Sequence, residues 1–123
     1  LVAHEVAHVL LFQRGSGTFL LNEGIPLWLT DDRRQPELDR LVAANALWTL
    51  DHLVDGPRDQ SEFFAGYAQA GAFVRFTAER HGDRAVIGMW EAGRRVPFAD
   101  AYREATGVDA ATAHVAWRSS LGR

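Results

Sequence analysis

The chain contains no cysteine among its 123 residues, which excludes disulfide bonds, thiolate zinc sites and cysteine nucleophiles. Histidine and carboxylate side chains are therefore its strongest candidates for binding a metal ion. Lysine is absent too, so all 13 basic residues are arginine, and the net charge is −3 with an isoelectric point of about 5.9. Nucleic-acid-binding domains usually carry a basic excess or a basic stripe. We accordingly expect no nucleic-acid partner.

Long apolar runs are also missing, and we expect no membrane segment in this chain. No signal peptide is recognisable. The chain begins at Leu1 rather than at a methionine, and we interpret it as a fragment or an excised domain. The compartment and the oligomeric state stay open.

Strand-like alternation of apolar and polar residues is not found in any convincing run, and neither is an internal repeat. Hydrophobic residues make up 47% of the chain and charged residues 24%, which is typical of a globular protein. The length fits one domain that spans residues 1–123. We expect a mainly α fold.

Apolar residues recur at helical spacing, and glycine, proline and polar residues mark the ends of these segments. Asn22 is expected to cap a helix, which would leave Pro26 near the first turn, where proline is tolerated. Asp109 is expected to cap the last helix. The predicted helices cover residues 1–14, 22–30, 36–54, 61–81, 83–92, 97–107 and 110–121.

One motif carries chemistry: residues 4–8 read His-Glu-Val-Ala-His, an HExxH pattern on a predicted helix. His4 and His8 are one turn apart, so both imidazoles lie on one face and can bind one zinc ion. Glu5 can reach a metal-bound water without being a ligand. Glu23 would complete the three protein ligands that a catalytic zinc requires, and water would take the fourth position.

The alternative for these histidines is ordinary core packing, which is the more frequent role of a lone histidine on an apolar helix. This helix, however, carries two histidines and a glutamate. Burying Glu5 without a partner would be costly, and a metal ion compensates for that cost better than any visible partner. We therefore favour a metal site.

The pattern resembles the gluzincin metallopeptidases, and among them the small bacterial peptidase-MA-like domains. HEVAH is followed by Asn22-Glu23-Gly24, with a spacer of 14 residues between His8 and Glu23. The segments GYAQAGAFVRFTAERHGDRA, PFADAYREATGVD and AWRSSL are similar to the helical tail of those domains. The resemblance implies a bacterial origin and the helical half of a zincin-like (α+β) domain. It also implies that the β-sheet, whose edge strand would pair with a peptide substrate, lies upstream of this chain.

The resemblance assigns roles to individual residues. It implies that one Zn²⁺ per chain is held by His4, His8 and Glu23, and that Glu5 is the general base. A tyrosine or another donor on a later helix often stabilises the oxyanion in this clan, and Tyr67 stands on a suitable helix. An arginine is a further candidate for that role, and Tyr67 could instead be a half-buried aromatic on a packing face.

The chain departs from the family at Leu27, where an acidic residue is common. A carboxylate that orients a ligand histidine would then come from elsewhere, and the candidates are Asp31, Asp32 and Glu62.

Together these features predict a zinc-dependent metallopeptidase, a hydrolase that acts on a peptide or protein substrate through a metal-activated water. The alternative is a non-catalytic helical zinc-binding or interaction module, that is, an inactive fragment of such a domain. Glu5 favours the enzyme, because a structural zinc site closes with four protein ligands and has no use for a general base.

The remaining histidines and the tryptophans have no motif around them. The histidines, which lack ligand-spaced partners, are expected at the surface or at helix ends: His52, His81 and His114. The tryptophans are expected to anchor the core: Trp28, Trp48, Trp90 and Trp117. The arginine pairs Arg33–Arg34 and Arg94–Arg95 are expected to be solvated loop charges.

Overall fold

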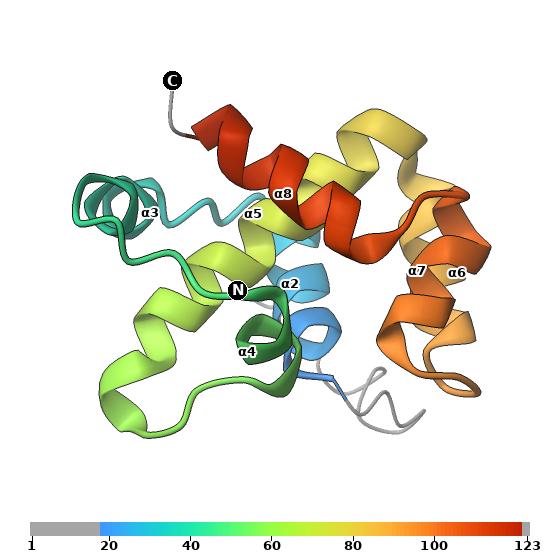
Figure 1. Cartoon of the computed structure of the whole chain (residues 1–123), viewed down its shortest axis with the longest axis horizontal. Coiled ribbons are helices and arrows are strands. Elements are labelled where there is room, and N and C mark those ends of the chain that lie inside the picture. Colours follow the sequence, from blue (N-terminus) through green and yellow to red (C-terminus); the bar gives the residue numbers. More distant parts are fainter. Residues whose placement is uncertain (1–17, 122–123) are drawn as a thin grey trace.

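Helices account for all the regular structure in residues 18–121, the part of the chain that the computed structural model describes (Figure 1). The helix predicted over residues 1–14, with His4, Glu5 and His8, lies outside these residues. Within them, the expected mainly α class is confirmed. The elements are α2 (Phe19–Leu29), α3 (Gln35–Ala43), α4 (Leu50–Asp55), a 3₁₀ turn (Gln60–Glu62), α5 (Phe63–His81), α6 (Asp83–Ala92), α7 (Phe98–Thr106) and α8 (Ala110–Leu121).

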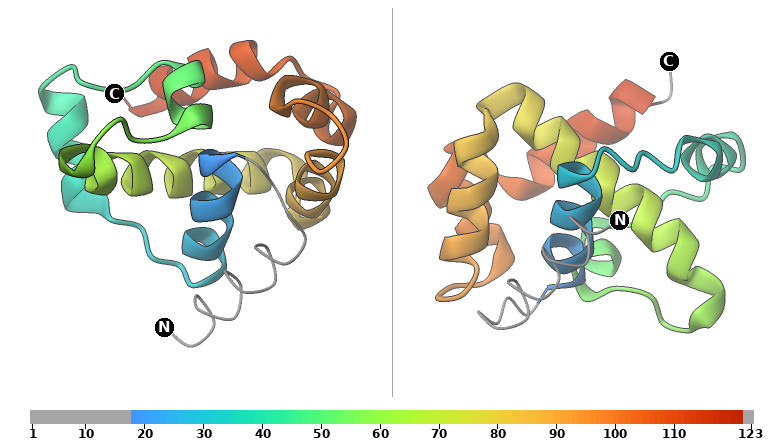
Figure 2. Two further views of the ribbon diagram at one scale, coloured as in Figure 1. Left: turned by 90° about the horizontal axis from the view of Figure 1, so that it is seen from below. Right: turned by 180° about the vertical axis from the view of Figure 1, so that it is seen from behind.

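Helix α5 is the central element, and α2, α3, α4, α6 and α8 all contact it. In the left view of Figure 2, α2 lies below α5 and α8 lies above it. Helices α6 and α7 pack against each other at one end of the molecule, and α7 also meets α8 (Figure 1). None of the helices in residues 18–121 combines the length and the apolar character that crossing a membrane requires.

An aromatic cluster holds α5 to α7 and α8. The ring of Phe73 lies 5.7 Å from the rings of both Tyr102 and Trp117 and 5.9 Å from that of His114. All four side chains are buried, and the Tyr102 hydroxyl is hydrogen-bonded to Thr77 Oγ1 at 2.9 Å. Helices α7 and α8 therefore help to fix the position of α5.

His114 corrects one expectation, because it is buried with 4% exposure rather than at the surface. It lies three residues before Trp117 on α8, so the two rings share the face that packs on α5. Burial, followed by the charge of Arg118, lowers the pKa of His114 and favours the neutral imidazole.

The tryptophans do anchor the core. Trp48 and Trp117 are buried, and Trp28 and Trp90 are half-buried against the same core cluster.

Two boundaries differ from the prediction in the first half of the chain. Helix α2 begins at Phe19, so Asn22 is an interior residue rather than the cap, and its N–H donates to Thr18 O at 3.0 Å. Pro26 lies inside this helix and is buried. A proline there removes one backbone hydrogen bond, and tertiary packing of the apolar face compensates for that loss.

The single helix predicted over residues 36–54 is instead two helices, α3 and α4. Asn45 adopts a left-handed conformation with φ 54°, which asparagine tolerates better than most residues. Thr49 then caps α4, because its hydroxyl accepts a hydrogen bond from His52 N. The later helices follow the prediction closely, and the Asp109 carboxylate accepts from Thr112 N at the start of α8, as expected.

The crossing of α2 over α5 at Gly24 is very close. A Cβ atom at this position would lie 2.6 Å from Ala70 O and 2.7 Å from Val74 Cγ2. Gly71 on α5 faces Leu27 in a similar way, with a Cβ separation of 3.1 Å. The missing side chains thus allow the two helix backbones to come together.

We expect Gly24→Ala to destabilise the protein by about 1–3 kcal/mol, because the new methyl group meets a backbone carbonyl that cannot move aside. Chemical denaturation monitored by circular dichroism measures this change. Gly88→Ala is the matched control, since a Cβ there meets only Ala105 at 3.7 Å and alanine favours the helix. Equal stability of the two variants would contradict the close crossing.

Candidate functional site

Two of the predicted site residues, Glu23 and Tyr67, lie on the two helices that cross at Gly24. Glu23 is a half-buried residue of α2, and Tyr67 is a half-buried residue of α5. The other predicted residues, His4, Glu5 and His8, lie outside the described part of the chain. Residues 18–121 alone contain no group of three side chains that could hold a metal ion. A metal site that uses Glu23 would therefore need ligands from outside these residues, and the predicted pair, His4 and His8, lies there.

The Glu23 carboxylate and the Tyr67 phenol are close enough to influence each other. Burial raises the pKa of Tyr67, and the negative charge of Glu23 raises it further. Arg34 acts in the opposite direction and lowers that pKa. The combined shift is upward, so the phenol stays protonated at neutral pH and can donate a hydrogen bond.

The Tyr67 ring is packed on three sides. Phe19 of α2 stacks on it with ring centroids 5.9 Å apart, and Phe63, one turn earlier on α5, stacks at 6.0 Å. The guanidinium carbon of Arg34 lies 5.6 Å from the ring centroid. Tyr67 is thus a packed aromatic, as the alternative interpretation required. That packing leaves it within the electrostatic range of Glu23, so the two interpretations are compatible.

Arg34 is the residue of this cluster that sequence reasoning missed. Its Nε donates to both carboxylate oxygens of Asp32, at 3.2 and 3.1 Å. Arg33 behaves as expected of a solvated charge, because it is exposed and pairs with Asp31 at 3.1 Å. The sequence signal was the run Asp-Asp-Arg-Arg at residues 31–34, which places two acids two residues before two bases.

The three candidate carboxylates for orienting a ligand histidine all have cationic or N–H partners. Asp31 accepts from Arg75 Nη1 at 2.9 Å, and Asp32 accepts from Arg34. Glu62 Oε1 accepts from Arg58 N at 2.8 Å and lies 3.0 Å from His52 Nε2. The histidines predicted as ligands are outside the described residues, so the orienting role stays a prediction.

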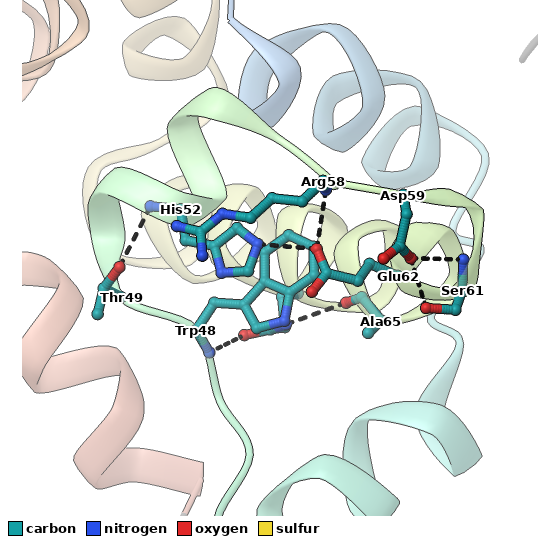
Figure 3. Close-up of polar contacts among 9 residues, drawn as sticks. Trp48, Thr49, His52, Arg58, Asp59, Ser61, Glu62 and Ala65 are labelled. Atoms are coloured by element: carbon teal, nitrogen blue, oxygen red, sulfur yellow. Dashed lines mark hydrogen bonds and ion pairs between the residues drawn. The ribbon is translucent and has the colours of Figure 1, made fainter.

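Glu62 belongs to a second polar cluster, which Figure 3 shows between α4 and the start of α5. The Trp48 indole stacks on the His52 ring with centroids 3.8 Å apart and planes within 2° of parallel. Trp48 N donates to Gln69 Oε1 of α5 at 2.8 Å. His52 was expected at the surface, but Trp48 and Glu62 cover most of its side chain, which is 13% exposed. His81 ends α5, as predicted.

Comparisons of the chain with family models, with curated proteins and with solved structures found no match.

We expect the Glu62 cluster to make stability depend on pH. The hydrogen bond from Arg58 N, followed by that from His52, lowers the pKa of Glu62. A carboxyl group with a lowered folded-state pKa stabilises the fold above its unfolded pKa, and this contribution is lost as the pH falls through the folded value. We expect Glu62→Gln to lower the unfolding midpoint at pH 7. The difference from the wild type should become smaller as the pH falls below the ordinary carboxyl pKa of about 4.3.

Unfolding midpoints of both proteins across the acid range measure this difference. Glu79→Gln is the control, because Glu79 is an exposed residue of α5. A Glu62→Gln effect that stayed constant from neutral to acid pH would show that the carboxylate charge is irrelevant to it.

Proposed function

We propose that this protein is a zinc-dependent metallopeptidase of the gluzincin type. The observation that carries the proposal is the neighbourhood of Glu23 and Tyr67 at the crossing of α2 and α5. The gluzincin resemblance implies that both residues serve one reaction, Glu23 as a metal ligand and Tyr67 as an oxyanion donor.

The proposed metal donors are the imidazoles of His4 and His8 and the carboxylate of Glu23. Two nitrogens and one oxygen form a donor set that suits catalytic zinc. A zinc ion bound there would supply Lewis acidity, which activates a water molecule and polarises the scissile carbonyl.

The chain's own residues would handle the protons. Glu5 would accept a proton from the attacking water and pass it to the leaving amine. Tyr67 would donate a hydrogen bond to the oxygen that becomes negative in the tetrahedral intermediate. The phenol is protonated at neutral pH, as an oxyanion donor must be.

The proposed fold is the helical half of a zincin-like domain. The all-helical arrangement of residues 18–121 is compatible with this proposal, and the substrate would be a peptide or a protein.

We expect the 123-residue chain to bind one zinc ion, and Glu23→Ala to weaken that binding. The zinc affinity should fall by more than roughly 10–100-fold, which is the usual loss when a residue that only orients a metal ligand is removed. Elemental analysis after metal stripping and re-addition gives the stoichiometry, and a competition titration gives the affinity. Glu79→Ala, at an exposed position of α5, is the matched control. Unchanged zinc affinity in Glu23→Ala would remove Glu23 from the ligand set.

Glu5→Gln should retain zinc and lose peptide turnover by about 10²–10⁴-fold, the usual contribution of a general base. Cleavage of a mixed peptide library, followed by mass spectrometry, measures turnover. Chelation should stop the wild-type reaction and added zinc should restore it. One bound zinc without any turnover would favour the non-catalytic helical zinc-binding module instead.

A further inference from the structure

The loop between α2 and α3 returns toward α5 and brings Arg34 to Tyr67. Arg34 precedes α3 and has a left-handed backbone, with φ 50° and ψ 37°. An L residue other than asparagine or aspartate adopts this conformation rarely, since its Cβ crowds the following carbonyl. Earlier in the same loop, Asp31 is tied to α5 through Arg75 at 2.9 Å. The loop is thus attached to α5 on both sides of Gly71, near Arg75 and near Tyr67.

Asp32 holds the Arg34 side chain in place. The Nε group lies within 3.2 Å of both carboxylate oxygens, and both residues are only partly exposed. The guanidinium is planar, so an ion pair at Nε restricts the direction in which its plane can face. The Tyr67 ring, with its centroid 5.6 Å from the guanidinium carbon, lies within the range of a cation–π contact.

We propose that Arg34, held by Asp32, is a positioning residue that fixes the Tyr67 phenol beside Glu23. This inference rests on the proposed function, because it takes Tyr67 as the donor to the oxyanion. Phe19 and Phe63 restrain the ring by stacking, and Arg34 adds both a third restraint and a positive charge. A positive charge near a phenol makes its O–H a stronger hydrogen-bond donor.

A purely structural role explains this arrangement less well. A partly exposed Asp–Arg pair contributes little to stability, yet the backbone at Arg34 adopts an unfavourable conformation. Arg33 pairs with one oxygen of Asp31 and has no such conformation. Arg34 differs from it in that it binds both oxygens of Asp32, directly precedes α3 and contacts Tyr67.

The test compares Arg34→Gln and Arg34→Lys with Arg33→Gln as the matched control. Kinetics on a cleaved peptide give kcat and KM separately, and NMR of chains labelled with ¹³C-tyrosine reports on the ring. The chain has two tyrosines, Tyr67 and Tyr102, so Tyr67→Phe assigns the signals. Tyr102 is buried in the core and serves as an internal reference for an intact fold.

We expect Arg34→Gln to reduce kcat on the order of 10–100-fold, as misplacement of a reacting group does, with little change in KM. The Tyr67 signal should move while the Tyr102 signal stays. Arg34→Lys should recover part of kcat, because it keeps the charge without the planar group. Arg33→Gln should match the wild type in both measurements.

Two outcomes separate this inference from the proposed function. Wild-type turnover combined with equal kcat in Arg34→Gln and Arg33→Gln would overturn the role of Arg34 and leave the peptidase proposal standing. Absence of turnover in the zinc-loaded wild type would overturn the peptidase proposal, and the catalytic purpose of the Arg34–Tyr67 contact with it.

Discussion

The close crossing of α2 and α5 at Gly24 is the constraint on which the rest of the structure depends. The missing side chain lets the α2 backbone approach the Ala70 carbonyl to a distance that no Cβ could tolerate. Glu23 immediately precedes this glycine, and Tyr67 lies three residues before Ala70 on α5. A one-residue shift of either helix would therefore move the carboxylate and the phenol apart. The packing contact and the candidate chemistry are fixed by the same short segments.

Local signals in the sequence predicted the second half of the fold well. Gly82 and Gly107 have positive φ values and end α5 and α7, and Asp109 caps α8. Such signals act over a few residues, so they can be recognised without knowledge of the tertiary structure. The break between α3 and α4 could not be recognised in this way. Apolar periodicity continues across residues 36–54, and the break accompanies the burial of Trp48, whose backbone N–H donates to Gln69 Oε1 on α5.

In the candidate site, too, local features could be predicted from the sequence and tertiary contacts could not. Motif and resemblance singled out Glu23 and Tyr67 individually, because each depends on residue type and on the helix that carries it. Arg34 could not be found in this way. Its contact with Tyr67 depends on a left-handed backbone and on the path of a loop, neither of which leaves a periodic signal. The surface position predicted for His114 was wrong for a related reason. The contacts of Phe73 with Trp117 and His114 decide which face of α8 packs on α5.

The charges around Tyr67 explain why one phenol could serve as a stable donor. Burial and the carboxylate of Glu23 favour the neutral phenol, whereas the guanidinium of Arg34 favours the phenolate. With the carboxylate alone, the O–H would be a weak donor, and with the guanidinium alone it would be closer to losing its proton. Asp32 balances the charge of Arg34 and holds its side chain, so the guanidinium acts on Tyr67 from a fixed position.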